Sequence, residues 1–195
     1  MKHLSNNKRE AFLEIIPKNS IGVELGVFQG EFSVSILNVV QPKLLWLIDP
    51  WWLLGTYTPG EPLGRPTNWK NRGDDSMLTD FTAMLIHLKD VLLQKQVMIK
   101  IENDLDALPS FSNDYFDWAY IDSSHAYEHT KQELEILKDK VKDDGYILGH
   151  DWYPDPSHRH HGVSKAVQEF IEKYSYELIF LDNHSQWCIQ KKISK

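Results

Sequence analysis

The sequence contains almost no cysteine, no long apolar run and no excess of positive charge. Its one cysteine, Cys188, excludes an internal disulfide framework and, within a predicted strand, is interpreted as a small buried apolar residue. The longest apolar run, residues 44–54, includes Asp49 and is too short to span a bilayer. The N-terminal segment MKHLSNNKRE lacks the apolar region of a signal peptide. We therefore expect a cytoplasmic protein without a membrane partner.

Length and charge narrow the class of protein further. With 195 residues the chain is predicted to form a single domain, residues 1–195, with a full core. A net charge of -7 and a pI near 5.7 leave no electrostatic footprint for nucleic acid, although a local basic patch is compatible with them. The expected partner is therefore a small molecule rather than a nucleic acid.

Strand and helix patterns alternate along the chain. Five short runs of apolar and β-branched residues predict strands, at residues 21–24, 44–48, 97–101, 116–121 and 146–148. Helical spacing separates them, as in the long helix predicted from Leu78 to Leu92. Residues 176–181 and 186–193 are typical of a closing hairpin. This order predicts an α/β fold: a Rossmann-like, doubly wound, seven-stranded and mostly parallel sheet with an antiparallel C-terminal hairpin strand.

A glycine turn after the first strand narrows the ligand. Residues 21–30 read IGVELGVFQG, so Gly26 and Gly30 do not form the GxGxxG fingerprint of a dinucleotide site. Glu24 precedes this turn, where a carboxylate would repel a pyrophosphate and suit a cationic ligand. Asp49 ends the second strand and can accept hydrogen bonds from both hydroxyls of a ribose. A ribose, an ammonium and a sulfonium without phosphate describe S-adenosylmethionine. The alternative is a turn that only packs a helix on a sheet.

One segment interrupts the alternation of strands and helices. Residues 51–73 contain prolines, glycines and three tryptophans, Trp51, Trp52 and Trp69. A loop of this length is usually functional or disordered, and the aromatic residues argue against disorder. Because it leaves the second strand beside the nucleoside pocket, we predict a lid insertion over residues 51–75. The alternative is a packed surface loop or an oligomer contact, as in a homodimer.

Polar side chains follow the fourth and fifth predicted strands. Asp122 and His125 lie in YIDSSHAYEH, and His150 and Asp151 lie in YILGHDW. Because neighbouring parallel strands direct their carboxyl ends to one crevice, these four side chains are expected to converge.

Together these segments resemble a known family. The order VELGVFQG, LIDPW, NDL, FDWAYIDSSHAYEH, DDGYILGHDW and GVSKAVQEF is similar to that of the class I S-adenosylmethionine-dependent methyltransferases. More narrowly, it resembles the macrocin-type and cephalosporin-pathway O-methyltransferases of methyltransferase family 24. The resemblance covers residues 18–192. Ser123 and Ser124 stand where the family usually has glycine and a second aspartate.

The resemblance implies positions for the cofactor. The glycine-turn residues would line the methionine side, Asp49 would hold the ribose, and the residues after the third strand would border the adenine. The cofactor positions are Glu24, Gly26, Gly30, Asp49, Asn103, Asp104, Leu105 and Asp122.

The resemblance also implies a divalent metal, because several relatives bind one with carboxylates after the fourth and fifth strands. The matching positions are Asp122, His150 and Asp151. Magnesium prefers oxygen ligands, whereas His150 suits manganese, iron, nickel or zinc better. A cation there would lower the pKa of a substrate hydroxyl and orient it. The structural alternatives are a helix N-cap for Asp122 and a hydrogen-bonded strand-end histidine for His150.

His125 is the candidate general base, since an unperturbed pKa of ~6.5 suits that role. With Asp122 and Asp151 it completes the predicted catalytic set; alternatively it pairs with Glu128 or holds Asp122. Three more histidines, His158, His160 and His161, are interpreted as part of a solvated loop whose position permits substrate contact.

These observations predict a transferase, an S-adenosylmethionine-dependent methyltransferase that O-methylates a small-molecule or sugar hydroxyl with help from a divalent metal. The alternatives are metal-independent transfer through a His/Asp base and a catalytically silent cofactor-binding module.

Overall fold

The computed structural model describes residues 9–51 and 76–192. The elements are η1 (Arg9–Ile15), β1 (Ile21–Leu25), α1 (Glu31–Val40), β2 (Leu44–Ile48), α2 (Ser76–His87), α3 (Lys89–Leu93), β3 (Val97–Lys100), α4 (Asp104–Ala107), η4 (Leu108–Ser110), β4 (Phe116–Ile121), α5 (Tyr127–Lys140), β5 (Val141–Gly149), α6 (His161–Lys173), β6 (Tyr176–Leu181) and β7 (Trp187–Lys191).

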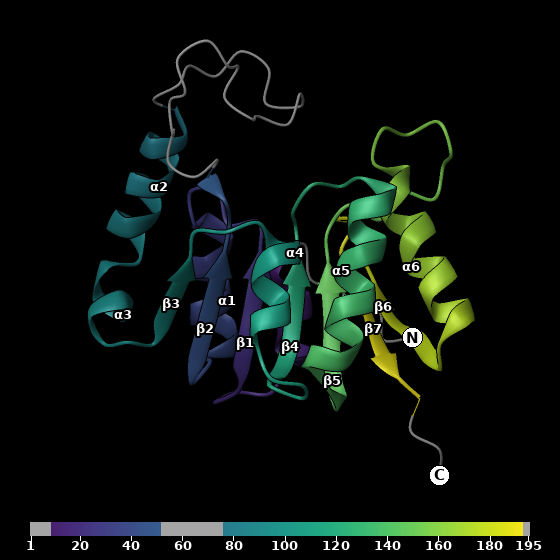
Figure 1. Cartoon of the computed structure of the whole chain (residues 1–195), viewed down its shortest axis with the longest axis horizontal. Helices are drawn as coiled ribbons and strands as arrows, with labels where there is room; N and C mark the ends of the chain where they lie inside the picture. The colour runs from purple at the N-terminus through teal and green to yellow at the C-terminus, as the bar shows by residue number, and fades with distance from the viewer. Residues whose placement is uncertain (1–8, 52–75, 193–195) are drawn as a thin grey trace.

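Seven strands form one sheet in the order β3-β2-β1-β4-β5-β7-β6 (Figure 1). The strands from β3 across to β5 pair in parallel, and β7 pairs antiparallel with both β5 and β6. The predicted mostly parallel sheet with an antiparallel C-terminal strand is therefore confirmed. The strand order reverses between β1 and β4, and in such sheets ligands bind beyond the carboxyl ends of the strands at this point.

Helices cover both faces of the sheet, and each face has its own apolar core. On the face that points forward in Figure 1, residues of α4, α5 and α6 pack on the sheet. On the opposite face, residues of η1, α1 and α2 do so. The strands are buried on both sides, which explains why β2 and β4 are almost continuously apolar in sequence. Cys188 of β7 is buried, as predicted.

Two elements differ clearly from the predicted ones, and the other strand ends differ by one or two residues at most. The long helix predicted from Leu78 to Leu92 is divided into α2 and α3 at Leu88, which has φ −106° and ψ 11° and is buried in the core. The apolar periodicity continues through the break, so it hides the division. The predicted short fifth strand begins earlier, at Val141, because residues 142–145 form an irregularity in its pairing with β4. Asp144 and Gly145 thus lie inside the strand.

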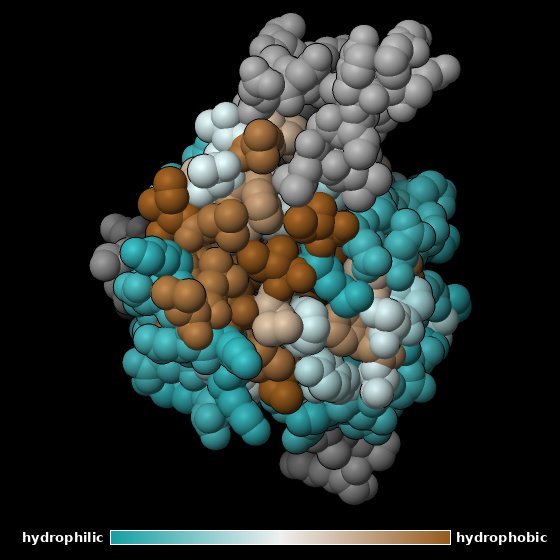
Figure 2. Space-filling model, turned by 60° about the vertical axis from the view of Figure 1, so that its left-hand side comes forward, coloured by the Kyte–Doolittle hydropathy of each residue, from teal (hydrophilic) through white to brown (hydrophobic). Residues whose placement is uncertain are grey.

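One side of the molecule carries the exposed apolar side chains (Figure 2). In the described part of the chain the exposed large apolar residues are Leu78, Ile86, Leu93 and Met98, from α2, α3 and the edge strand β3. An apolar surface beside an unpaired sheet edge suits contact with another protein surface. The predicted homodimer stays a prediction. Among the described helices none is long and apolar enough to cross a membrane.

Candidate active site

The glycine turn is built around the carboxylate of Asp49. The backbone N–H groups of Val27 and Phe28 donate to its Oδ2 at 2.9 and 3.0 Å, and that of Trp51 donates to Oδ1 at 2.7 Å. Burial raises the pKa of Asp49, although the hydrogen bonds from Phe28, Trp51 and Val27 oppose this effect. The carboxylate thus joins the end of β2 to the turn that follows β1. The residue predicted to hold the ribose therefore also fixes the conformation of the glycine turn.

Gly26 and Gly30 have left-handed backbone conformations, with φ of +83° and +75°. A Cβ on Gly26 would lie 2.2 Å from the carbonyl oxygen of Asp122 on the neighbouring strand tip. The turn after β1 and the polar segment after β4 are therefore in direct contact. The two predicted halves of the site, glycine turn and polar cluster, share one edge of the sheet.

Replacing Gly26 by alanine is expected to lower the free energy of unfolding by about 2–4 kcal/mol, because it adds backbone strain to a clash with main-chain atoms. Chemical denaturation monitored by circular dichroism would measure this loss. Gly30→Ala is the comparison variant. Its Cβ would meet the flexible side chain of Met84 at 2.9 Å, so the loss should be smaller. An equal or greater loss for Gly30→Ala would contradict the assigned contact at Gly26.

The predicted lid, residues 51–75, lies outside the described residues except for Trp51. This tryptophan is fully buried, and its Nε1 donates to the carbonyl oxygen of Phe28 at 2.9 Å. Its ring also packs edge-on against Phe81 of α2, with 4.9 Å between the ring centroids. The segment that follows β2 therefore starts on the glycine turn.

Three other residues predicted to bind the cofactor, Glu24, Asn103 and Asp104, each make hydrogen bonds within the protein. Glu24 is buried, and its Oε2 accepts a hydrogen bond from Ser33 of α1. Asn103 caps α4, since its Oδ1 accepts from the backbone N–H of Leu105 at 3.1 Å. Asp104 lies beside them, but its carboxylate accepts from His129 of α5 at 2.7 Å. The structure thus directs Asp104 toward α5.

The four polar residues after β4 and β5 converge, as the strand order predicts. His125 Nε2 lies 3.3 Å from Asp122 Oδ1 and 3.1 Å from Asp151 Oδ2. His150 Nδ1 lies 3.6 and 3.4 Å from the same two oxygens. We call these four residues the carboxylate–histidine cluster. The N-cap of α5 is Ala126, so Asp122 does not have the capping role that was its structural alternative.

His160 joins this cluster, which corrects its interpretation as part of a solvated loop. Its Nδ1 lies 2.8 Å from Asp151 Oδ1, and its ring lies 4.6 Å from that of His125 between centroids. The loop after β5 thus returns to the cluster through His160, and Asp151, where the loop begins, has a left-handed conformation with φ +64°. The contact between His160 and Asp151 could not be predicted from the sequence, because the order of histidines in a loop does not indicate the conformation of that loop.

The electrostatics of the cluster follow from burial and pairing. Burial of His150 favours its neutral form, but hydrogen bonds to Asp122 and Asp151 outweigh this and raise its pKa to about 9. Burial opposes ionisation of Asp151, but the hydrogen bond from His150 and the charge of His125 lower its pKa to about 2. Without a cation the cluster is thus held together by ion pairs.

The residues present fit a divalent metal ion. Asp122, His150 and Asp151 each offer one ligand atom, and these atoms lie within 4.8 Å of one another. Ligands held at about 2.0–2.2 Å from one ion lie roughly 3 Å apart, close to the separations observed here. Two carboxylates and an imidazole form a mixed set of oxygen and nitrogen ligands, which suits manganese, iron or zinc better than magnesium.

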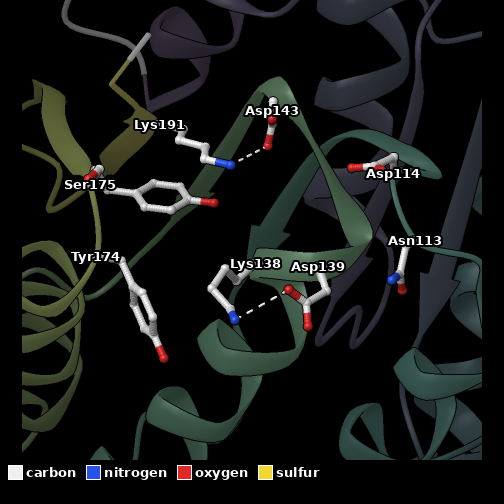
Figure 3. A pocket seen from close by; sticks show the side chains of 9 residues that line it. Asn113, Asp114, Lys138, Asp139, Asp143, Tyr174, Ser175 and Lys191 are labelled. Atoms are coloured by element: carbon white, nitrogen blue, oxygen red, sulfur yellow. Dashed lines mark hydrogen bonds and ion pairs between the residues drawn. The ribbon is translucent and has the colours of Figure 1, made fainter. Parts of the chain in front are cut away.

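A hollow of about 430 Å³ lies elsewhere, where β4, β5 and β6 begin (Figure 3). Its lysines are already paired, Lys191 with Asp143, and Lys138 with Asp139 at 3.3 Å. Because these charges are paired and the hollow lies at the amino ends of the parallel strands β4 and β5, we assign no ligand to it.

Comparison with known proteins agrees with this geometry. A family model described as a methyltransferase domain matches residues 23–152. No curated protein matches the sequence. Among solved structures, a protein provisionally described as an rRNA methylase, from Clostridium thermocellum, is 12% identical, with 100% of this chain and 99% of that chain covered and a TM-score of 0.63.

Two more solved structures share the fold. One, from Streptococcus mutans, is provisionally described as a methyltransferase in complex with SAH; it is 12% identical, with 97% of each chain covered and a TM-score of 0.60. The other, an S-adenosylmethionine-dependent O-methyltransferase from Thermotoga maritima, is 9% identical, with 100% of this chain and 69% of that chain covered and a TM-score of 0.59. At these identities the likeness concerns the fold.

Fold and family match together define the class, the S-adenosylmethionine-dependent methyltransferases of class I. Within that class, the chain belongs to the methyltransferase domain family whose model it matches. The resemblance drawn from the sequence is thereby confirmed, and the protein is an enzyme.

Proposed function

We propose that this methyltransferase acts on a hydroxyl oxygen of a small molecule or sugar. The observation that carries the proposal is the carboxylate–histidine cluster, which stands at the carboxyl ends of β4 and β5 in contact with the glycine turn. A cofactor on the turn would direct its methyl group toward an acceptor on the cluster. The net charge of -7 supports a small acceptor over a nucleic acid.

The reaction is an in-line displacement. The acceptor oxygen attacks the methyl carbon, the carbon–sulfur bond breaks, and its electron pair stays on the sulfur of a neutral thioether. The proton of the hydroxyl needs an acceptor, and His125 is the candidate. Its Nε2 faces Asp122 and Asp151, so the proton of the neutral ring belongs there and Nδ1 is left to accept. The two carboxylates would stabilise the resulting imidazolium.

A divalent cation held by Asp122, His150 and Asp151 would lower the pKa of the acceptor hydroxyl and fix its orientation. His160 supports this arrangement, because its hydrogen bond to Oδ1 of Asp151 leaves Oδ2 directed at His125 and His150. The same residues can therefore hold the cation and orient the acceptor. We further propose that residues 1–195 form one domain.

His160→Gln is expected to weaken manganese binding by about 10- to 100-fold, since it removes a residue that orients a ligand and not the ligand itself. Isothermal titration of Mn²⁺ into the chelator-treated protein would measure this. His184→Gln, in the turn between β6 and β7, is the matched control. Unchanged manganese affinity in His160→Gln would show that Asp151 is oriented without it.

The function is tested first by calorimetric titration of S-adenosylhomocysteine, with and without Mn²⁺ or Mg²⁺, and then by methyl transfer from labelled S-adenosylmethionine to a panel of hydroxylated acceptors. Micromolar binding and transfer to a small hydroxylated molecule would support the proposal, and loss of transfer with a chelator would support metal assistance. Transfer only to RNA would contradict the proposed acceptor. Binding without transfer to any acceptor would favour the silent cofactor-binding module.

A further inference from the structure

A second group of ligand-type side chains lies outside the carboxylate–histidine cluster. Asp104 of α4 and two residues of α5, His129 and Glu133, each bring a ligand atom within 4.8 Å of the others. His129 Nε2 lies 2.7 Å from Asp104 Oδ1 and 3.8 Å from Glu133 Oε1. His129 and Glu133 are four residues apart, so they share one face of the helix. Helices α4 and α5 thus bring three potential metal ligands close together.

Two of these three side chains, Asp104 and Glu133, are carboxylates buried in the core. Glu133 is fully buried, and its Oε1 accepts from Ser123. When both carboxylates are ionised, its Oε2 has no hydrogen-bond partner among the described residues, and a proton would join it to Asp104. Asp104 is 5% exposed. Two carboxylates this close in a medium of low dielectric need a proton or a cation between them. His129, with a side chain 20% exposed, gives an ion a route from solvent.

We propose that Asp104, His129 and Glu133 bind a divalent transition-metal ion, with Zn²⁺ as the best match. One imidazole and two carboxylates are ligands that zinc accepts, and a nitrogen donor disfavours magnesium and calcium. Ligands about 2.0–2.1 Å from a tetrahedral ion lie roughly 3.3 Å apart. The separations of 2.7 and 3.8 Å lie on either side of this value, so small side-chain movements suffice.

An ion at this place would connect three segments of the fold. It would join α4 to α5 directly, and Ser123, which donates to Glu133, would link it to the segment after β4. Because Asp104 begins α4, the ion would also fix the turn formed by Asn103 and Leu105. An ion bound here would stabilise the packing of these segments, and the inference does not depend on the proposed methyl acceptor.

Zinc binding to the whole chain tests the inference. The chelator-treated protein is titrated with Zn²⁺ in competition with a chromogenic chelator, and bound zinc is counted by mass spectrometry. Glu133→Gln should bind one ion fewer than the wild type, or bind that ion at least about 100-fold more weakly, because a ligand is lost. Glu128→Gln, an exposed position on the same helix, is the matched control and should bind as the wild type does.

Zinc could also bind to the carboxylate–histidine cluster. Repeating the comparison in a His150→Gln background distinguishes the two sites, because this substitution weakens metal binding by that cluster alone. Glu133→Gln should still remove one ion there. Equal zinc binding with and without Glu133→Gln would overturn the inference and show that the two carboxylates share a proton; the proposed function would be unaffected. A glutamine amide can donate to Asp104, so Glu133→Gln is expected to fold, and circular dichroism checks this. Should it not fold, His129→Gln carries the same comparison.

Discussion

Asp49→Ala is expected to weaken the binding of S-adenosylhomocysteine by at least about 100-fold. The carboxylate accepts three backbone hydrogen bonds, from Val27, Phe28 and Trp51, and these fix the turn on which the cofactor would lie. The variant also loses the predicted partner of the two ribose hydroxyls. A hydrogen bond to a charged group contributes about 1.5–3 kcal/mol, so the loss of two bonds to the ribose corresponds to about 100-fold or more.

Calorimetric titration of S-adenosylhomocysteine measures this effect, and thermal unfolding recorded beside it separates loss of affinity from loss of folded protein. Asp49→Asn keeps the size of the side chain and one carbonyl acceptor, so its affinity should fall between those of the wild type and Asp49→Ala. Asp90→Ala, at an exposed position of α3, controls for removal of a negative charge. A folded Asp49→Ala protein with wild-type affinity would refute the assignment of the cofactor pocket.

Residues fixed by strand order could be placed from the sequence. The convergence of Asp122, His125, His150 and Asp151 follows from two rules: parallel strands end at one edge, and neighbouring strands bring their following residues together. The register of β4 and β5, in which Ile121 pairs with Gly149, puts Asp122 beside His150. No knowledge of side-chain packing is needed for this step.

Residues placed by loop conformation or by helix packing could not be found in this way. His160 reaches Asp151 through an irregular loop whose path depends on the positive φ of Asp151, and periodicity carries no information about it. Glu133 lies on α5, and a glutamate in a helix usually indicates a position exposed to solvent. Here its buried carboxylate instead lies beside Ser123 and Asp104, which come from two other segments. The sequence pattern therefore missed both.

Asp151→Asn is expected to lower kcat/KM for the acceptor by at least about 100-fold while leaving the affinity for S-adenosylhomocysteine within a factor of about three. Asp151 is 4% exposed and contacts His125, His150 and His160. An amide cannot neutralise an imidazolium there or serve as an anionic ligand to a cation. Removing one partner from a buried ion pair costs about 3–5 kcal/mol, and each 1.36 kcal/mol of barrier is tenfold in rate.

Methyl transfer and Mn²⁺ titration on the same preparations distinguish the causes of that loss. Metal assistance predicts that Asp151→Asn weakens manganese binding together with kcat, whereas a pure base mechanism predicts a lower kcat with no metal dependence in either protein. Asp155→Asn, an exposed position in the same loop, should change neither quantity. Activity retained in Asp151→Asn would remove the cluster from the reaction. Since Asp151 is the residue that joins all three imidazoles, no other single substitution separates the cofactor side of the site from the acceptor side so directly.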